Sequence, residues 1–306
     1  MSASPQLPES LLPSLAQSCQ QQQYPTACLY LVPTPIGNIT DISVRALYTL
    51  QLADAIACED TRNTATLLSR YGLHKPLIAA HQHNERSVAE KIITCLQAGQ
   101  RIALVSDAGM PAISDPGARL VQAVREAGLT VQALPGPCAA VTALAASGFL
   151  AERFYFIGFL PTKASQREQV LREYQQAPAN LVFYEAPHRI EETLAALEAV
   201  FGGERQVLLA REISKLFEEL ASMPLAQARA WLDADKMRNK GEYVLVVAGA
   251  DAGLEQDQAE ALRILQILMA ELPLKQAASL TAEITGLKKN ALYESGLRLK
   301  EVDKGA

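Results

Sequence analysis

From Cys28 to Ala248 the chain alternates short apolar runs with longer amphipathic segments, and this alternation limits the folds open to it. In the first half, the apolar runs have the length and composition of buried strands. They are Cys28–Val32, Ala55–Cys58, Leu77–Ala79, Ile102–Val105 and Thr130–Leu134. Strands that alternate with helices predict a mainly parallel sheet with helices on both faces. We therefore expect an α/β fold.

A second alternating set follows a change of composition at Gly148–Arg153, which predicts a hinge. Its strands are expected at Phe154–Ile157, Leu181–Tyr184, Gln206–Ala210, Phe217–Ser222 and Tyr243–Ala248. Lengths and spacings predict an N-terminal α/β domain at 28–147 and a smaller C-terminal α/β domain at 148–249. A cleft between two such domains is the expected ligand site.

Both ends of the chain differ from this pattern. Residues 1–27 are rich in Pro, Ser and Gln, which predicts a disordered extension. Residues 250–306 have helical periodicity, with two short pieces, Lys275–Thr285 and Asn290–Leu299, split by Gly286. That spacing is typical of a helix-turn-helix. It fits equally a plain three-helix appendage used for packing or dimerisation.

Composition narrows the class of protein and of partner. The formal net charge of −5 means that a nucleic-acid partner requires a local basic patch. The five cysteines form no C-x-x-C pair, which favours reduced thiols over a disulfide framework. No run approaches the roughly 20 apolar residues of a membrane span. No Lys or Arg precedes Arg45, so a signal peptide is not expected and the predicted location is the cytoplasm.

The segment after Ile102–Val105 reads SDAGMPAISDPG and is the first candidate for a ligand loop. In open α/β sheets, ligands bind at the carboxyl ends of strands. Gly109 and Gly117 let backbone approach a ligand closely, and Asp107 and Asp115 supply acceptors. The loop lacks G-x-G-x-x-G and a Walker-type Lys, so dinucleotide and triphosphate sites are not indicated.

Other polar segments stand at predicted strand ends in the same way. They read LVPTPIGNITD, CEDTRNT, HQHNE, LPGPCAA, FYEAPHR and AREISK, beginning at Leu31, Cys58, His81, Leu134, Phe183 and Ala210. Each has a structural alternative, such as helix capping by Asp60 or Asn84. A lysine such as Lys215 can act as a base if burial lowers its pKa. Lys236, Arg238 and Lys240 form the best candidate basic patch, although solvated loops often look the same.

Taken in order from Leu29 to Val247, these segments resemble the ribosomal RNA small subunit methyltransferase I family of the tetrapyrrole methylase superfamily. The motifs VSDAGMPAISDPG and KGEYVLVV carry the resemblance with the others. The resemblance implies a two-domain α/β fold, usually a homodimer, with S-adenosylmethionine in the interdomain cleft. It implies 2'-O-methylation of a cytidine ribose in the decoding region of 16S (small-subunit) ribosomal RNA. It also favours RNA contact by the helix-turn-helix-like tail.

The resemblance places the cofactor contacts by position. They are Pro35, Ser106, Asp107, Gly109, Met110, Ser114, Asp115, Cys138, Ala139, Tyr184, Gly241 and Glu242. RNA contacts are expected at Arg62, His81, His83, Asn84, Arg189, Arg211, Lys236, Arg238, Lys240, Lys288 and Lys289. The chain departs from the family at Met110, commonly Thr, and at Gln82, commonly Asp, which removes an acid from the substrate side.

A ribose hydroxyl is a poor nucleophile, so a base or strong acceptor should assist the transfer. The candidates are Lys215, Glu212, Glu59 and Asp60. Two alternatives remain at this point: a small-molecule tetrapyrrole methyltransferase of the same fold, and a non-catalytic RNA-binding module. No nucleophile elbow and no set of metal ligands indicates a hydrolase, and a metal site at His81 and His83 lacks a third ligand.

Overall fold

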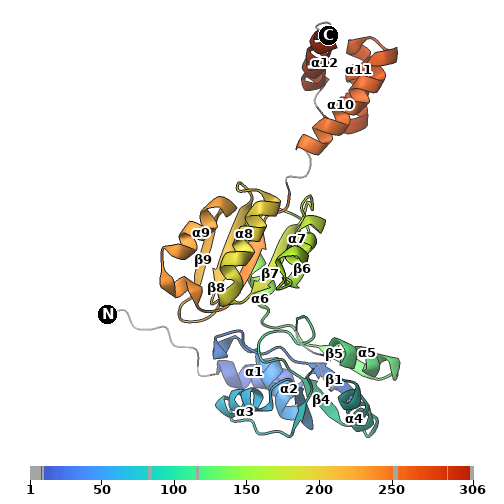
Figure 1. Cartoon of the computed structure of the whole chain (residues 1–306). Helices are drawn as coiled ribbons and strands as arrows, with labels where there is room; N and C mark the ends of the chain where they lie inside the picture. The colour runs from blue at the N-terminus through green and yellow to red at the C-terminus, as the bar shows by residue number, and fades with distance from the viewer. Residues whose placement is uncertain are drawn as a thin grey trace.

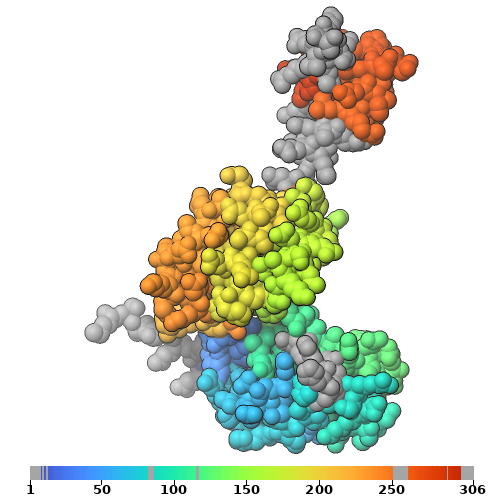
Figure 2. Space-filling model, in the orientation of Figure 1, coloured from blue at the N-terminus to red at the C-terminus, as the bar shows by residue number. Residues whose placement is uncertain are grey.

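The computed structural model describes residues 8, 10–81, 85–114, 117–250, 254–287 and 289–303. Within them the chain forms two five-stranded sheets, each with its own helices, followed by three more helices (Figure 1). We call the two sheets with their helices the first unit and the second unit, and Figure 2 shows them in direct contact. The predicted α/β class is confirmed. In the described ranges no helix combines the length and apolarity needed to cross a lipid bilayer.

The first unit is the parallel sheet that the alternation predicts. Its strands are β1 (Cys28–Leu31), β2 (Ala55–Cys58), β3 (Leu77–Ala79), β4 (Arg101–Leu104) and β5 (Thr130–Ala133), in the order β3-β2-β4-β1-β5. Every pairing in it is parallel. Its helices are α2 (Val44–Leu52), α3 (Thr61–Arg70), α4 (Glu85–Gln97) and α5 (Ala118–Glu126). Leu50 and Leu68 are buried on one face, and Ile92 and Leu120 on the other.

The second unit has a mixed sheet, which alternation does not predict. Its strands are β6 (Phe154–Phe159), β7 (Asn180–Glu185), β8 (Gln206–Arg211), β9 (Glu219–Pro224) and β10 (Tyr243–Val247), in the order β6-β7-β10-β8-β9. Only β6 and β7 pair in parallel. The short connection from β8 to β9 holds no crossover helix, so these strands must run antiparallel. The helices α7 (Ala164–Glu173), α8 (Ile190–Phe201) and α9 (Leu225–Asp233) cover one face.

The other face of the second sheet is covered by α6 (Ala139–Ser147). Ala140 and Ala143 of this helix are buried against Val182 and Val246. Small side chains allow the helix to approach the sheet closely. The sequence assigned residues 28–147 to the first domain because composition changes only at Gly148, but the packing puts α6 with the second sheet.

Of residues 1–27, the structure describes 8 and 10–27, and it differs there from the expected disorder. A helix, α1 (Leu11–Gln20), packs against α2. Its Cys19 is buried, and the Arg101 guanidinium donates two hydrogen bonds of 3.1 Å to the Tyr24 carbonyl. The prediction of disorder rested on the polar composition and overlooked Leu11, Leu15 and Cys19, which recur every four residues. A helix brings residues at that spacing to one side.

The C-terminal part consists of α10 (Leu254–Glu271), α11 (Leu274–Thr285) and α12 (Lys289–Asp303). Their common core includes Leu265, Ala277 and Leu292. α11 ends at Gly286, whose φ of +74° is the left-handed conformation that glycine supplies at helix ends. The helices predicted from periodicity are therefore present and packed together.

Candidate functional site

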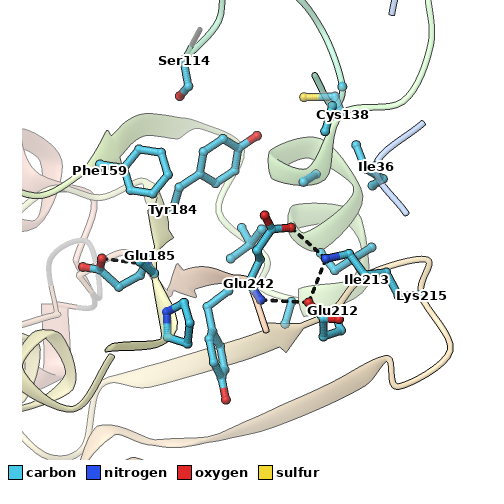
Figure 3. A pocket seen from close by; sticks show the side chains of 18 of the residues that line it. Ile36, Ser114, Cys138, Phe159, Tyr184, Glu185, Glu212, Ile213, Lys215 and Glu242 are labelled. Atoms are coloured by element: carbon cyan, nitrogen blue, oxygen red, sulfur yellow. Dashed lines mark hydrogen bonds and ion pairs between the residues drawn. The ribbon is translucent and has the colours of Figure 1, made fainter. Parts of the chain in front are cut away.

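A cavity of about 490 Å³ lies where the two units meet (Figure 3). The first unit contributes residues that follow β1 and β4, and the second contributes the ends of β7 and β8 and the start of β10. The carboxyl ends of strands are the usual ligand-binding edge of α/β sheets. Of the predicted cofactor contacts, those that line the cavity are Gly109, Met110, Ser114, Cys138, Ala139, Tyr184 and Glu242.

The wall from the first unit is formed by two loops that backbone hydrogen bonds tie together. Thr34 and Gly109 exchange two backbone hydrogen bonds of 3.0 Å, which tie the loop after β1 to the loop after β4. Gly109 has a φ of +80°, and a Cβ there would lie 3.3 Å from Ile36 Cγ2. The buried Ser106 hydroxyl donates to the Gly109 carbonyl at 3.1 Å. Ser106 therefore shapes this loop rather than lining the cavity.

Aromatic rings of the second unit form an apolar wall. Tyr184 packs edge-on against Phe156 and Phe159, with ring centroids 5.0 and 5.7 Å away. The Tyr184 hydroxyl accepts a hydrogen bond from the Ala140 N–H at 3.2 Å. That contact satisfies one of the free N–H groups at the start of α6. The wall can take a flat apolar group, such as an adenine ring.

Charged side chains gather at the other end of the cavity. Lys215 Nζ lies 2.8 Å from Glu212 Oε1 and 2.8 Å from Glu242 Oε2 (Figure 3). Glu212 Oε1 also accepts the Glu242 N–H at 2.9 Å. The first unit reaches this cluster, because a Cβ at Gly37 would lie 2.4 Å from Lys215 Cγ. The Ser214 hydroxyl donates to Asp41 at the end of η1 (Ile39–Asp41).

The backbone that presents this cluster is strained. Glu212 has a φ of +52° and Ser214 a φ of +67°. This is the left-handed backbone conformation, which residues other than glycine rarely adopt. Gly241 has a φ of +88°, and a Cβ there would lie 2.6 Å from Glu212 Cγ. Such strain persists where surrounding contacts enforce it, and it concentrates at functional sites.

The cluster also sets the protonation of its members. Burial lowers the pKa of Lys215, but its hydrogen bonds to Glu212 and Glu242 and their charges outweigh burial and raise it. Burial raises the pKa of Glu212, but the Lys215 hydrogen bond and the Glu242 N–H outweigh burial and lower it. Lys215 is thus a cation at neutral pH. A lysine base would require the opposite direction.

Several predicted residues of the first unit are not among the residues that line the cavity. Asp60 caps α3, and its Oδ1 accepts the Arg62 N–H at 2.7 Å. Asn63 Nδ2 donates to Asp107 Oδ2 at 2.8 Å. Glu59 and Arg62 are exposed at this edge. Pro35 and Gly241 also lie next to the lining without joining it.

Two arginines expected to contact RNA are used inside the second unit. Arg211 is buried and donates to the carbonyls of Lys240 and Met237, both at 2.8 Å. Arg189, in η2 (Pro187–Arg189), lies 3.3 Å from the fully buried carboxylate of Glu185. A guanidinium committed to internal acceptors is not available to phosphates. The structure therefore does not support RNA contact by either side chain.

The remaining predicted RNA contacts differ in exposure. Arg238, in η3 (Lys236–Asn239), pairs with Glu219 and stacks on Trp231 at 3.9 Å. Lys236, Lys240 and Lys289 are exposed, whereas His81 is half-buried. His83, Asn84, Asp115 and Lys288, with the departure at Gln82, lie outside the described residues.

Some residues that line the cavity were not among the predicted site residues. These residues include Ile36, Ile113, Phe159, His188, Ile213 and Tyr243. Phe159 is 56% exposed at the end of β6, two residues beyond the predicted end of that strand. Its apolar, aromatic strand could have indicated it. Among the described residues, no three His, Cys, Asp or Glu side chains come together as a metal site.

Comparison with protein families gives two matches along the chain. The family of Tetrapyrrole (Corrin/Porphyrin) Methylases matches residues 28–229. The RsmI C-terminal HTH domain matches residues 255–300. Together the two matches cover the first unit, the second unit as far as α9, and most of the C-terminal helices.

Curated relatives bear the name Ribosomal RNA small subunit methyltransferase I. The protein of Escherichia coli O157:H7 is 52% identical over 269 residues, which cover 88% of this chain and 94% of the relative. The protein of Vibrio cholerae serotype O1 is 53% identical over 270 residues, with the same coverages.

Solved structures share the fold at low sequence identity. Diphthine synthase superposes with a TM-score of 0.58 at 15% identity, over 72% of this chain and 90% of that one. The methyltransferase CobJ gives a TM-score of 0.55 at 20% identity, over 72% and 94%. These likenesses concern the fold alone.

Proposed function

The chain belongs to the tetrapyrrole methylase family, among the ribosomal RNA small subunit methyltransferases I, and we propose that it methylates a cytidine 2'-hydroxyl in the decoding region of 16S ribosomal RNA. The methyl donor is S-adenosylmethionine. The observation that carries the proposal is the 52% identity to a relative of that name along 88% of the chain. The cavity between the two units is the proposed site of this activity.

The residues around the cavity fit S-adenosylmethionine. Gly109 adds no side chain to the lining, so a ligand can approach the backbone closely there. Gly109, Met110, Cys138 and Ala139 would hold the cofactor together with the aromatic face of Tyr184. The bound cofactor supplies an activated methyl group on a sulfonium. Asp107 stays a predicted contact, and calorimetry on Asp107→Ala tests it.

The charged cluster is suited to the ribose hydroxyl. In-line transfer depends first on holding the attacking oxygen in position. The Lys215 ammonium would stabilise negative charge on that oxygen as the O–H bond breaks. The proton would pass to a carboxylate of the same cluster, Glu212 or Glu242. Glu242 is well placed to meet substrate because its side chain is 79% exposed.

RNA would be held by cations outside the cavity. Lys236 and Lys240 are exposed in the segment that precedes Glu242, and Arg62 is exposed in the first unit. Lys289 lies in the part matched by the RsmI C-terminal HTH domain. These positions make phosphate contact without needing a positive net charge.

We further propose a homodimer that works in the cytoplasm. The edge strand β6 supports self-association, because Phe154 and Tyr155 are 47% and 43% exposed on it. Aromatic residues exposed together on an edge strand are typical of a contact surface.

Tritiated methyl transfer from S-adenosylmethionine tests the proposed function. The acceptors are undermethylated small subunits and naked small-subunit RNA, followed by nuclease mapping of the labelled nucleotide. We expect label on one cytidine ribose. No incorporation with either acceptor would exclude the function, and label on a small tetrapyrrole instead would favour the alternative activity of the same fold.

A further inference from the structure

Two loops of the second unit expose apolar side chains next to the cavity. Leu216 is 89% and Phe217 66% exposed, directly after the cavity residue Lys215. Met237 in η3 is 51% exposed. Its neighbours Lys236 and Lys240 are exposed as well. We call Leu216, Phe217, Lys236, Met237 and Lys240 the lip.

The lip is held together from beneath by Arg211. One guanidinium donates to the Phe217 carbonyl at 3.4 Å and to the Met237 and Lys240 carbonyls at 2.8 Å. The two loops therefore meet within the reach of a single buried side chain. These hydrogen bonds fix the backbone of both loops, and the side chains of the lip are exposed to solvent.

The first of the two loops is also closed on itself. The Glu218 carboxylate accepts the Ser214 N–H at 2.5 Å, and the Glu218 N–H donates to the Lys215 carbonyl at 3.2 Å. The same turn carries Lys215 into the charged cluster. The position of Phe217 is thus coupled, over two residues, to the position of Lys215.

On a ribose methyltransferase, an exposed aromatic ring beside exposed lysines is suited to binding single-stranded RNA. Unpaired bases of RNA stack on aromatic side chains while lysines meet the phosphates. The chain has a net charge of −5, so RNA must be attracted by local groups such as these. On the basis of the proposed function, we propose that Phe217 stacks on an unpaired base beside the methylated nucleotide, with Lys236 and Lys240 on the flanking phosphates.

Substitutions at Phe217 separate stacking from plain apolar contact. Methyl transfer by the full chain is measured against the concentration of undermethylated small subunits. Phe217→Ala and Phe217→Leu should raise the KM for subunits roughly tenfold, with little change in kcat. Phe217→Tyr should stay near wild type, because it keeps the ring. The control is Leu150→Ala, which removes a side chain that is 97% exposed and outside the lip.

Filter binding of the same variants to small subunits gives a readout that does not depend on transfer. Weaker binding by Phe217→Ala and Phe217→Leu, but not Phe217→Tyr, supports the lip even if the nucleotide methylated differs from the proposal. Equal binding and equal KM for the leucine variant overturns the stacking role. A change of sedimentation mass in Phe217→Ala overturns it too, because the lip would then contact a second copy. If the wild type transfers no methyl group, that result contradicts the proposed function, and the binding measurements still test the lip.

Discussion

The two walls of the cavity are built in different ways. The first unit presents uncharged loop residues, held by the Thr34–Gly109 pair of backbone hydrogen bonds. The second presents charged side chains, held by strained backbone at Glu212 and Ser214. A wall without formal charges binds a ligand mainly by its shape. A side-chain wall can place charge where a reaction develops it. This difference predicts which substitutions should change affinity and which should change rate.

Removing the cation should break the second wall most strongly. Lys215→Met leaves two carboxylates without their ammonium, and kcat should fall by about 100-fold or more. S-adenosylmethionine affinity, measured by calorimetry, should change far less. Lys215→Arg should recover part of the rate because it restores charge. The control is Lys91→Met, an exposed lysine on α4. Full activity in Lys215→Met would remove Lys215 from the mechanism.

Moving Glu212 should come next in size. Gly241→Ala puts a Cβ 2.6 Å from Glu212 Cγ and 2.7 Å from Cδ, so the carboxylate must leave Lys215. We expect kcat to fall by about 100-fold at most, since displacements of about 1 Å have that effect. Gly128→Ala is the matched control, because Gly128 has a φ of +73° with nothing within 4 Å. Equal losses in both variants would point to backbone strain alone.

The first wall should respond in affinity instead. Gly109→Ala places a methyl group 3.3 Å from Ile36 Cγ2, at a φ of +80°. The loop must shift, and the Kd for S-adenosylmethionine should rise roughly tenfold. At saturating cofactor, kcat should stay near wild type. If kcat falls and Kd does not change, the contrast between the walls is incorrect.

The smallest effect is on stability, and it follows from the pKa directions. The folded pKa of Glu212 is below its usual 4.5, so its contribution is present above 4.5 and is lost as pH falls through the folded value. The folded pKa of Lys215 is above its usual 10.5, so its contribution is present below 10.5 and is lost as pH rises through the folded value. Lys215→Met should cost about 1 kcal/mol between these limits. Urea unfolding midpoints at several pH values measure it, and a constant difference at all pH values would contradict it.

The sequence predicted the strands of both sheets because most of them coincide with short apolar runs. It placed β9 two residues too early, at Phe217–Ser222 instead of Glu219–Pro224, because that strand alternates half-buried and exposed residues and is not a continuous apolar run. It did not predict that β10 runs antiparallel in the centre of the second sheet, because apolar content carries no strand direction. Seven of the cofactor contacts that the family resemblance predicts lie on the lining of the cavity, where strand ends share one edge of a sheet.

The charged residues were harder to assign. Arg211 looks like an RNA contact in sequence, but its acceptors are carbonyls up to 29 residues away. The protonation of Lys215 depends on Glu242, which lies 27 residues along the chain. Such partners are set by tertiary packing, so local sequence shows the residue type but not its role.

The packing of α6 has a mechanical consequence for the cavity. The chain leaves the first unit at Gly136, where a Cβ would lie 2.7 Å from Pro33 Cβ, and joins the second sheet at Ala140. Cys138 and Ala139, between these anchor points, line the cavity. The joint between the units and the binding surface are thus the same few residues. A ligand that fills the cavity stiffens that joint, and any movement of the joint reshapes the cavity.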